Sequence, residues 1–285
     1  MTTSARWRTA ASEVLRAGAG FALADVDPDS TPGYTGRKRD GVDDLAEGAT
    51  RLGELQERLF AQSVAGTAEG SVLLLLQAMD TAGKGGVVRH VVGAVDPQGV
   101  ELAAFKKPTE EELAHDFLWR VERRLPEPGR IGVFDRSHYE DVLIGRVRAL
   151  APPEEIQRRY GAIEEFEADA AARGIRWVKV MLHLSREEQR KRLADRLDRP
   201  DKQWKYNPGD VDEQERWDDY MAAYQVAIER TSSEAAPWHV VPADRKWYAR
   251  LAVQELLAEA LAGLNPTWPA PDYDVEREKA RLAAT

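Results

Sequence analysis

The sequence contains no cysteine, so it offers neither a disulfide bond nor a thiolate ligand for a metal. No segment approaches the roughly 20 apolar residues that a membrane-spanning helix requires. The first 15 residues also lack the apolar core of a secretory signal. We therefore expect a cytoplasmic location and no membrane partner, and the absence of cysteine is compatible with this.

A surplus of basic residues is missing as well, because 49 acidic residues outnumber 40 lysines and arginines and give a net charge of −9. General nucleic-acid binding normally relies on a broad basic surface, so we expect no nucleic-acid partner. An anionic ligand stays possible, since the local field of a cleft matters more than the total charge. With 285 residues, 43% of them hydrophobic, the chain suffices for one large domain or two small ones with a buried core.

Short apolar runs alternate with helical patterns along most of the chain. The runs are nearly continuous in apolar character, which is typical of parallel strands covered on both faces. They span residues 72–77, 100–105, 131–135, 177–184 and 239–242, and the helical patterns span residues 42–63, 86–95, 109–125 and 152–173. Thr109 and Glu112 have the spacing of a capping box at one helix start. This alternation predicts an α/β layer fold with right-handed crossovers.

The segment after the first predicted strand, AMDTAGKG at residues 78–85, has the length and placement of a phosphate-binding P-loop. In such a loop, backbone N–H groups turn toward a phosphate, and the following helix N-terminus adds a favourable dipole. We expect the phosphate to lie against Ala82, Gly83, Gly85 and Gly86, with the charge of Lys84 on its oxygens. The alternative is a plain turn between strand and helix.

Two residues depart from the usual P-loop pattern. Ala78 stands where a glycine is common, and Gly85 stands where a serine or threonine normally binds Mg²⁺. Another oxygen must then hold the metal, and Asp80 inside the loop is the obvious candidate.

The third predicted strand ends in an acid, in the segment RIGVFDRSHYED at residues 130–141. This is the pattern of a Walker B strand, whose carboxylate holds Mg²⁺ directly or through water. We expect Asp135 and Asp80 to lie side by side and share the metal. Arg136 has the geometry to bridge phosphate oxygens, or else to pair with a neighbouring acid. We expect His138 to pack or orient a neighbour, because an anionic phosphate acceptor needs no base.

A basic run follows the fourth predicted strand, at residues 185–206, and we interpret it as part of a mobile lid. Arg192, Arg196 and Arg199 recur at spacings of four and three, so they lie on or near one helix face. A lid arginine stabilises transition-state charge in related chemistry. The alternative is a solvated helix with internal ion pairs. Lys106 and Lys107 follow the second strand and either extend a basic track or are surface lysines.

Together these segments resemble the polyphosphate kinase 2 family. The resemblance covers residues 34–266 and is carried by MDTAGKGG, FDRSHYEDVL, RLADRLDRPDKQWKY and APWHVVPADRKWYARL. It implies a P-loop kinase fold with three α/β/α layers, about five parallel strands and a helical lid, similar to nucleoside monophosphate kinases. It also implies reversible transfer of phosphate between inorganic polyphosphate and nucleotides with Mg²⁺, or Mn²⁺ in its place. The matching functional positions are Asp80, Lys84, Asp135, Arg136 and Arg196.

The residues after Arg136 and Ser137 indicate a subclass. Members restricted to one phosphorylation step tend to read WYNRAG there, whereas this sequence has His138, Tyr139, Glu140 and Asp141. This resembles the subclass that acts on both AMP and ADP, with Glu140 influencing the acceptor or the metal. The resemblance further implies an adenine nucleotide substrate, with a guanine nucleotide as an alternative, and a homodimer or homotetramer.

Three regions follow from these assignments. Residues 1–66 form an N-terminal extension with a long loop at 22–42 and a helix. Residues 67–264 form the phosphotransferase domain, with its lid at about 185–210, and residues 265–285 form a tail of three prolines and a charged helix. Two other functions stay open, namely an ATP-dependent nucleotide or small-molecule kinase on the same fold and a nucleotide-binding regulatory switch. The sequence has no NKxD guanine-recognition motif, which weighs against a GTPase.

Overall fold

The computed structural model describes residues 4–285, so the first three residues of the predicted N-terminal extension lie outside the described part. At its centre is a sheet of five parallel strands in the order β2-β3-β1-β4-β5. The strands are β1 (Ser71–Gln77), β2 (Val100–Ala104), β3 (Ile131–Asp135), β4 (Ile175–His183) and β5 (Trp238–Pro242). Each of the five predicted strands is present, with ends that differ by at most two residues, and the predicted α/β fold is confirmed.

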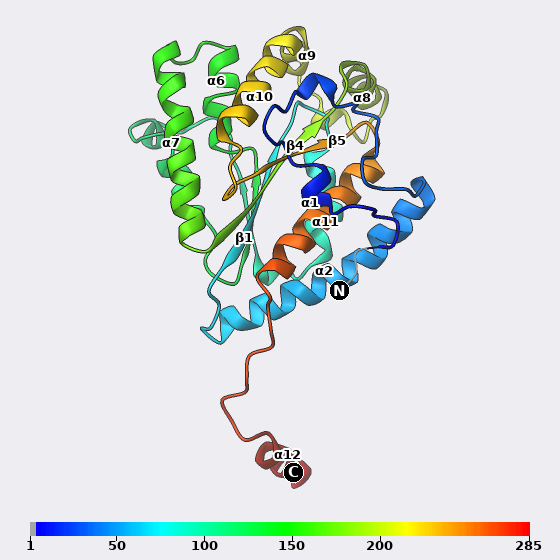
Figure 1. Ribbon diagram of the computed structural model, residues 1–285, viewed down its shortest axis with the longest axis vertical. Coiled ribbons are helices and arrows are strands. Elements are labelled where there is room, and N and C mark those ends of the chain that lie inside the picture. Colours follow the sequence, from blue (N-terminus) through cyan, green and yellow to red (C-terminus); the bar gives the residue numbers. More distant parts are fainter. Residues whose placement is uncertain (1–3) are drawn as a thin grey trace.

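Helices cover both faces of the sheet (Figure 1). The α-helices are α1 (Ala11–Val14), α2 (Lys38–Val64), α3 (Lys84–His90), α4 (Glu110–Leu113), α5 (Trp119–Glu122), α6 (Ile144–Val147), α7 (Pro153–Ala172), α8 (Arg186–Asp198), α9 (Gly209–Glu215), α10 (Trp217–Thr231), α11 (Lys246–Gly263) and α12 (Val275–Ala283). Short 3₁₀ turns are η1 (Leu23–Asp25), η2 (Val92–Ala94), η3 (Pro97–Gly99), η4 (His138–Asp141) and η5 (Gln203–Lys205). Among the described helices, none is both long and apolar enough to cross a membrane.

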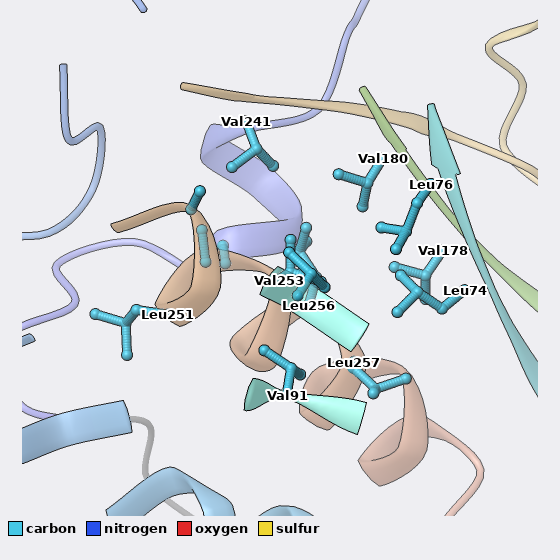
Figure 2. Packing of buried hydrophobic residues seen from close by; sticks show 14 of the residues in the cluster. Leu74, Leu76, Val91, Val178, Val180, Val241, Leu251, Val253, Leu256 and Leu257 are labelled. Atoms are coloured by element: carbon cyan, nitrogen blue, oxygen red, sulfur yellow. The ribbon is translucent and has the colours of Figure 1, made fainter. Parts of the chain in front are cut away.

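The central strand β1 is buried along its whole length and divides the interior into two cores. Because side chains alternate along a strand, Leu74 and Leu76 face one core and Leu73 and Leu75 face the other. The first core lies against α11, where Leu76 and Leu256 belong to the same buried cluster (Figure 2). The second core lies against α7 and α10. This double burial explains why the strand reads as a continuous run of leucines.

The predicted helix over residues 109–125 is wrong in its length. Its capping box forms, with Thr109 N–H donating to Glu112 at 2.8 Å and Glu112 N–H donating to Thr109 at 3.2 Å. The helix nevertheless ends at Leu113, and a second short helix begins at Trp119. Asp116 lies between them and accepts a hydrogen bond from Leu118 N–H at 3.0 Å. An aspartate that bonds nearby backbone competes with a continuing helix, which explains the break.

Other predicted boundaries shift by a few residues. The helix predicted over residues 42–63 begins at Lys38, so the predicted loop over residues 22–42 is shorter and also contains η1. The helix predicted over residues 86–95 starts at Lys84, ends at His90 and continues as η2. The helix predicted over residues 152–173 is α7.

The two ends of the chain are placed differently. The N-terminal segment packs into the domain, since Ala17 N–H donates to Trp238 O at 2.8 Å and Val240 N–H donates to Leu15 O at 2.9 Å. The C-terminal tail instead runs away from the sheet and ends in the isolated helix α12 (Figure 1). Helix α12 has Asp274 as its N-cap.

Candidate active site

A short loop follows β1, where the sequence predicts a phosphate-binding loop. Residues 78–83 connect the strand to α3, which begins at Lys84. Gly83 has a backbone φ of 123°, a conformation that residues with a side chain rarely adopt. Lys84 Nζ donates to Ala78 O at 3.0 Å, so the two ends of the loop are joined by a hydrogen bond. A Cβ on Gly85 would meet no other atom within 4 Å, so packing does not require glycine there. The space in front of Gly85 is instead part of a cavity.

The loop is fixed from behind by helix α8. The guanidinium of Arg192 is 6% exposed and donates to Thr81 O and Ala82 O at 3.1 and 3.0 Å. It also donates to two carbonyl oxygens after β5, at 2.8 Å each, and to Glu188 at 2.8 Å. Gln189 adds a bond to Asp80 O at 3.1 Å. Since all five donors of Arg192 are engaged, the structure places this predicted binding residue as a support of the loop.

Asp135 and Arg136 lie at the carboxyl end of β3, next to the loop. Asp135 pairs in register with Leu76, and Arg136 has a left-handed φ of 65° that an arginine seldom adopts. Its guanidinium lies 3.3 Å from Asp80 and 4.0 Å from Glu140. Burial lowers the pKa of Arg136, but the charges of Glu140, Asp80 and Asp135 outweigh it, so the net shift is upward. Arg136 is therefore a permanent cation between two carboxylates.

The large cavity, of about 650 Å³, lies in front of the loop. Two acids line it, Asp80 and Asp135, against nine lysines and arginines. These cations are Lys84, Arg89, Lys106, Arg136, Arg196, Lys202, Lys205, Lys246 and Arg250. Burial, followed by the nearby charges of Arg192 and Arg89, lowers the pKa of Arg250. The excess of cations over acids in the lining indicates a cavity suited to an anion.

A small pocket of about 200 Å³ lies on the other side of Asp80 and Arg136, which line both spaces. Its other charged side chains are all acidic, namely Glu140, Asp210 and Glu213. The remaining lining residues are Ala78, Met79, Leu143, Ile144, Asn207, Gly209, Tyr220 and Tyr224. Burial, together with the charge of Asp80, raises the pKa of Asp210 to about 6. Burial also raises the pKa of Glu140.

The structure thus brings together most of the predicted site residues. Asp80, Lys84, Asp135, Arg136 and Arg196 line the large cavity, as do Ala82, Gly83, Gly85, Gly86 and Lys106, while Glu140 lines the small pocket. Lys107 lines a neighbouring groove. Arg199 is about half exposed, pairs with Asp201 at 3.0 Å and lies outside both spaces. Within the predicted lid, only residues from Arg196 onward reach the cavity.

Three cations that line the cavity were not among the residues predicted from the sequence, namely Arg89, Lys246 and Arg250. Lys246 and Arg250 lie one helical turn apart at the start of α11, directly after β5. A search for cations after the carboxyl end of every parallel strand would have found them, because these ends meet at one edge of the sheet.

His138 lies outside both spaces. Its side chain is fully buried, and Nε2 lies 3.3 Å from Glu167, which also accepts a hydrogen bond from Tyr139 at 2.9 Å. Lys179 donates to Tyr139 at 3.0 Å and ties the same cluster to β4. This position agrees with the prediction that His138 packs or orients its neighbours.

Comparison with known proteins identifies the family. The sequence model described as "Polyphosphate kinase 2 (PPK2)" matches residues 37–267. An AMP/ADP-polyphosphate phosphotransferase of Meiothermus ruber is 45% identical over 257 residues, covering 90% of this chain and 94% of that protein. An ADP-polyphosphate phosphotransferase of Rhodopseudomonas palustris is 47% identical over 231 residues, covering 77% and 78% of the two chains.

A solved structure agrees with these relatives. The crystal structure of polyphosphate kinase 2 from Arthrobacter aurescens TC1 superimposes with a TM-score of 0.96 at 58% identity, covering 98% of each chain. The family predicted from the P-loop, the Walker B strand and the basic run is thereby confirmed. The chain belongs to the polyphosphate kinase 2 family.

Proposed function

We propose that this protein transfers the terminal phosphoryl group of inorganic polyphosphate to an adenine nucleotide, converting AMP to ADP and ADP to ATP reversibly. One observation carries the proposal: a cation-lined cavity and a small acidic pocket meet at Asp80 and Arg136. A polyanionic donor suits the cavity. A nucleoside suits the pocket, whose carboxylates and tyrosines accept or donate hydrogen bonds to neutral hydroxyl and amino groups. The relatives named for these substrates support the assignment.

The transfer itself follows from this arrangement. An anionic oxygen of the acceptor's terminal phosphate attacks the terminal phosphorus of the chain in line. The bond to the bridging oxygen breaks, and the shortened polyphosphate leaves with the electron pair. Lys84 and Arg136 face this point and stabilise the oxygens of the transferring group. Because the attacking oxygen is already charged, no general base is needed.

The cavity also fits a magnesium ion, with Mn²⁺ as an alternative. Asp80 and Asp135 are hard oxygen donors that line the same cavity. Among the described residues no third His, Cys, Asp or Glu completes a metal-binding cluster. This suits Mg²⁺, which usually takes one or two carboxylates and completes its shell with waters and phosphate oxygens. When bound, the ion offsets the repulsion between the two anionic substrates.

The test is an assay without ATP. The purified protein is incubated with Mg²⁺ and polyphosphate, with AMP and ADP as separate acceptors, and we expect ADP and ATP as products. No product from either acceptor would overturn the proposal. ATP as the only donor tests the alternative of an ATP-dependent kinase, and tight nucleotide binding without phosphate consumption would indicate a regulatory switch.

The predicted homodimer or homotetramer and the cytoplasmic location also belong to this proposal. Light scattering of the purified full chain measures the oligomeric state. A monomer at all concentrations would contradict the proposed homodimer or homotetramer.

A further inference from the structure

A second basic groove adjoins the large cavity at the end of β2. This distal groove has a volume of about 360 Å³ and shares Ala104, Phe105 and Lys106 with the cavity. Its other lining residues are Ala103, Lys107, Thr109, Glu112, Trp119, Arg120, Arg123 and Arg124. The cations of the cavity therefore continue without a break into the groove.

The charge of the groove is largely uncompensated. Its one lining carboxylate, Glu112, is already engaged with Arg120 at 3.4 Å and with the backbone of Thr109. Arg120 also donates to Lys106 O at 2.9 Å, which fixes the floor of the groove. Within the described residues, the four remaining cations form no ion pair within 4.0 Å; these are Lys106, Lys107, Arg123 and Arg124.

The groove has little to offer a nucleobase. Two aromatic side chains line it. Phe105 is buried and packs edge-on against Phe134, and Trp119 stacks on His115 with the ring centres 4.1 Å apart. The guanidinium of Arg123 lies 4.7 Å from the centre of the Trp119 ring. Since neighbours already cover this ring, a base gains no free stacking surface there. The chemistry of the groove instead matches a plain chain of negative charges.

We propose that the distal groove binds the far part of a long polyphosphate chain while the chain's terminal phosphate lies at the P-loop. This inference rests on the proposed function and extends it to chain-length selection. A long chain occupies the cavity and the groove at once, so its second contact is intramolecular and adds affinity. A chain too short to leave the cavity gains nothing from the groove.

The test compares two donors with ADP as acceptor, long-chain polyphosphate and tripolyphosphate. The double variant Arg123→Gln/Arg124→Gln removes two charges from the groove. We expect its KM for long-chain polyphosphate to rise about three- to tenfold, the effect of two solvent-accessible ionic contacts. We expect its KM for tripolyphosphate to stay at the native value. The single variant Arg124→Gln keeps the contact between Arg123 and Trp119. We expect it to show a smaller rise in KM for long-chain polyphosphate and again no change in KM for tripolyphosphate.

The matched control is Arg277→Gln/Lys279→Gln, which removes the same charge from α12, far from the sheet (Figure 1). It is expected to leave both KM values unchanged. A second readout is the salt dependence. Each phosphate contact that the variant loses lowers the number of counterions released on binding, so log KM depends less steeply on log salt concentration. We expect a shallower slope in the groove variant for the long chain only.

Two results would overturn the proposal. One is a KM ratio between long and short donors that is the same in the groove variant and the native protein. The other is an equal shift of that ratio in the α12 control. Failure of the proposed function is distinguishable, because the native protein would then form no ATP from either donor.

Discussion

The large cavity and the small pocket share Asp80 and Arg136 but differ in the balance of the other charged side chains that line them, among which Asp135 is the cavity's one further acid. Eight further lysines and arginines line the cavity, whereas the other charged residues of the pocket are the acids Glu140, Asp210 and Glu213. The protein as a whole has a net charge of −9. Total charge therefore says little about which ligands this protein binds, because burial and local grouping decide the electrostatic field inside each space.

Asp80 lines both spaces, and Lys84 lies in the same loop and lines the large cavity. We expect Asp80→Asn and Lys84→Ala each to lower kcat at least about 100-fold, since each removes charge that stabilises the transition state or the metal. Steady-state kinetics with polyphosphate and ADP measures the effect. Near-native rates in both variants would refute the junction as the reaction centre.

On the cavity side, Lys246→Gln/Arg250→Gln removes two cations from α11. We expect KM for polyphosphate to rise about tenfold, equivalent to about 1.4 kcal/mol, while KM for ADP stays unchanged. The control is Arg190→Gln/Lys191→Gln, on the exposed face of α8 outside both spaces. If KM for ADP rose as much as KM for polyphosphate, the assignment of the cavity to the donor would be wrong.

On the pocket side, Glu140→Gln removes a charge that faces Arg136. We expect the ratio of kcat/KM for AMP to that for ADP to change about fivefold, or about 1 kcal/mol, with KM for polyphosphate unchanged. The ratio is measured with each acceptor at saturating polyphosphate. An unaltered preference would count against a role of Glu140 in choosing the acceptor.

The smallest expected effect concerns Asp210, which bonds Arg196 at 3.2 Å. Its folded pKa of about 6 exceeds the ordinary value of 3.8, so the folded state binds more protons than the unfolded state between these pH values. This group's contribution to stability therefore falls as pH rises from about 4 to about 6. We expect the Tm of Asp210→Asn minus the native Tm to increase over that window and to level off above it. A constant difference would contradict the raised pKa.

Much of the fold was readable because local pattern and burial agree. The run of leucines in β1 predicts a strand buried on both faces, and β1 is the central strand. The helix over residues 109–125 was misjudged because the capping box of Thr109 marks where a helix starts and says nothing of where it ends. Its length was decided by Asp116, which accepts a bond from a nearby backbone N–H.

The clustering of the candidate site residues was predictable to a similar degree. Asp80, Lys84, Asp135 and Arg136 stand in contiguous motifs, and the structure brings them into one cavity. The lid arginines looked alike in sequence, since helical spacing alone cannot say what each one meets. In the structure Arg196 pairs with Asp210 and lines the cavity, whereas Arg199 pairs with Asp201 and lies outside both spaces.

Arg192 shows why side-chain roles need the tertiary structure. Its partners are carbonyl oxygens at Thr81 and Ala82 and at Ala243 and Asp244, two segments far away in the chain. No local pattern encodes such contacts, because they arise only when β1, β4 and β5 lie side by side in the sheet.

By itself, the sequence determined the family, the α/β fold and the identity of the phosphate loop, because these depend on contiguous motifs and on hydrophobic pattern. The tertiary structure alone decided that Lys246 and Arg250 line the same cavity as the phosphate loop. It also decided that a basic cavity and an acidic pocket meet at Asp80 and Arg136. The physical reason is the parallel sheet. It gathers the carboxyl ends of strands that are distant in sequence at one edge, where the charged residues that follow them line the same cavity.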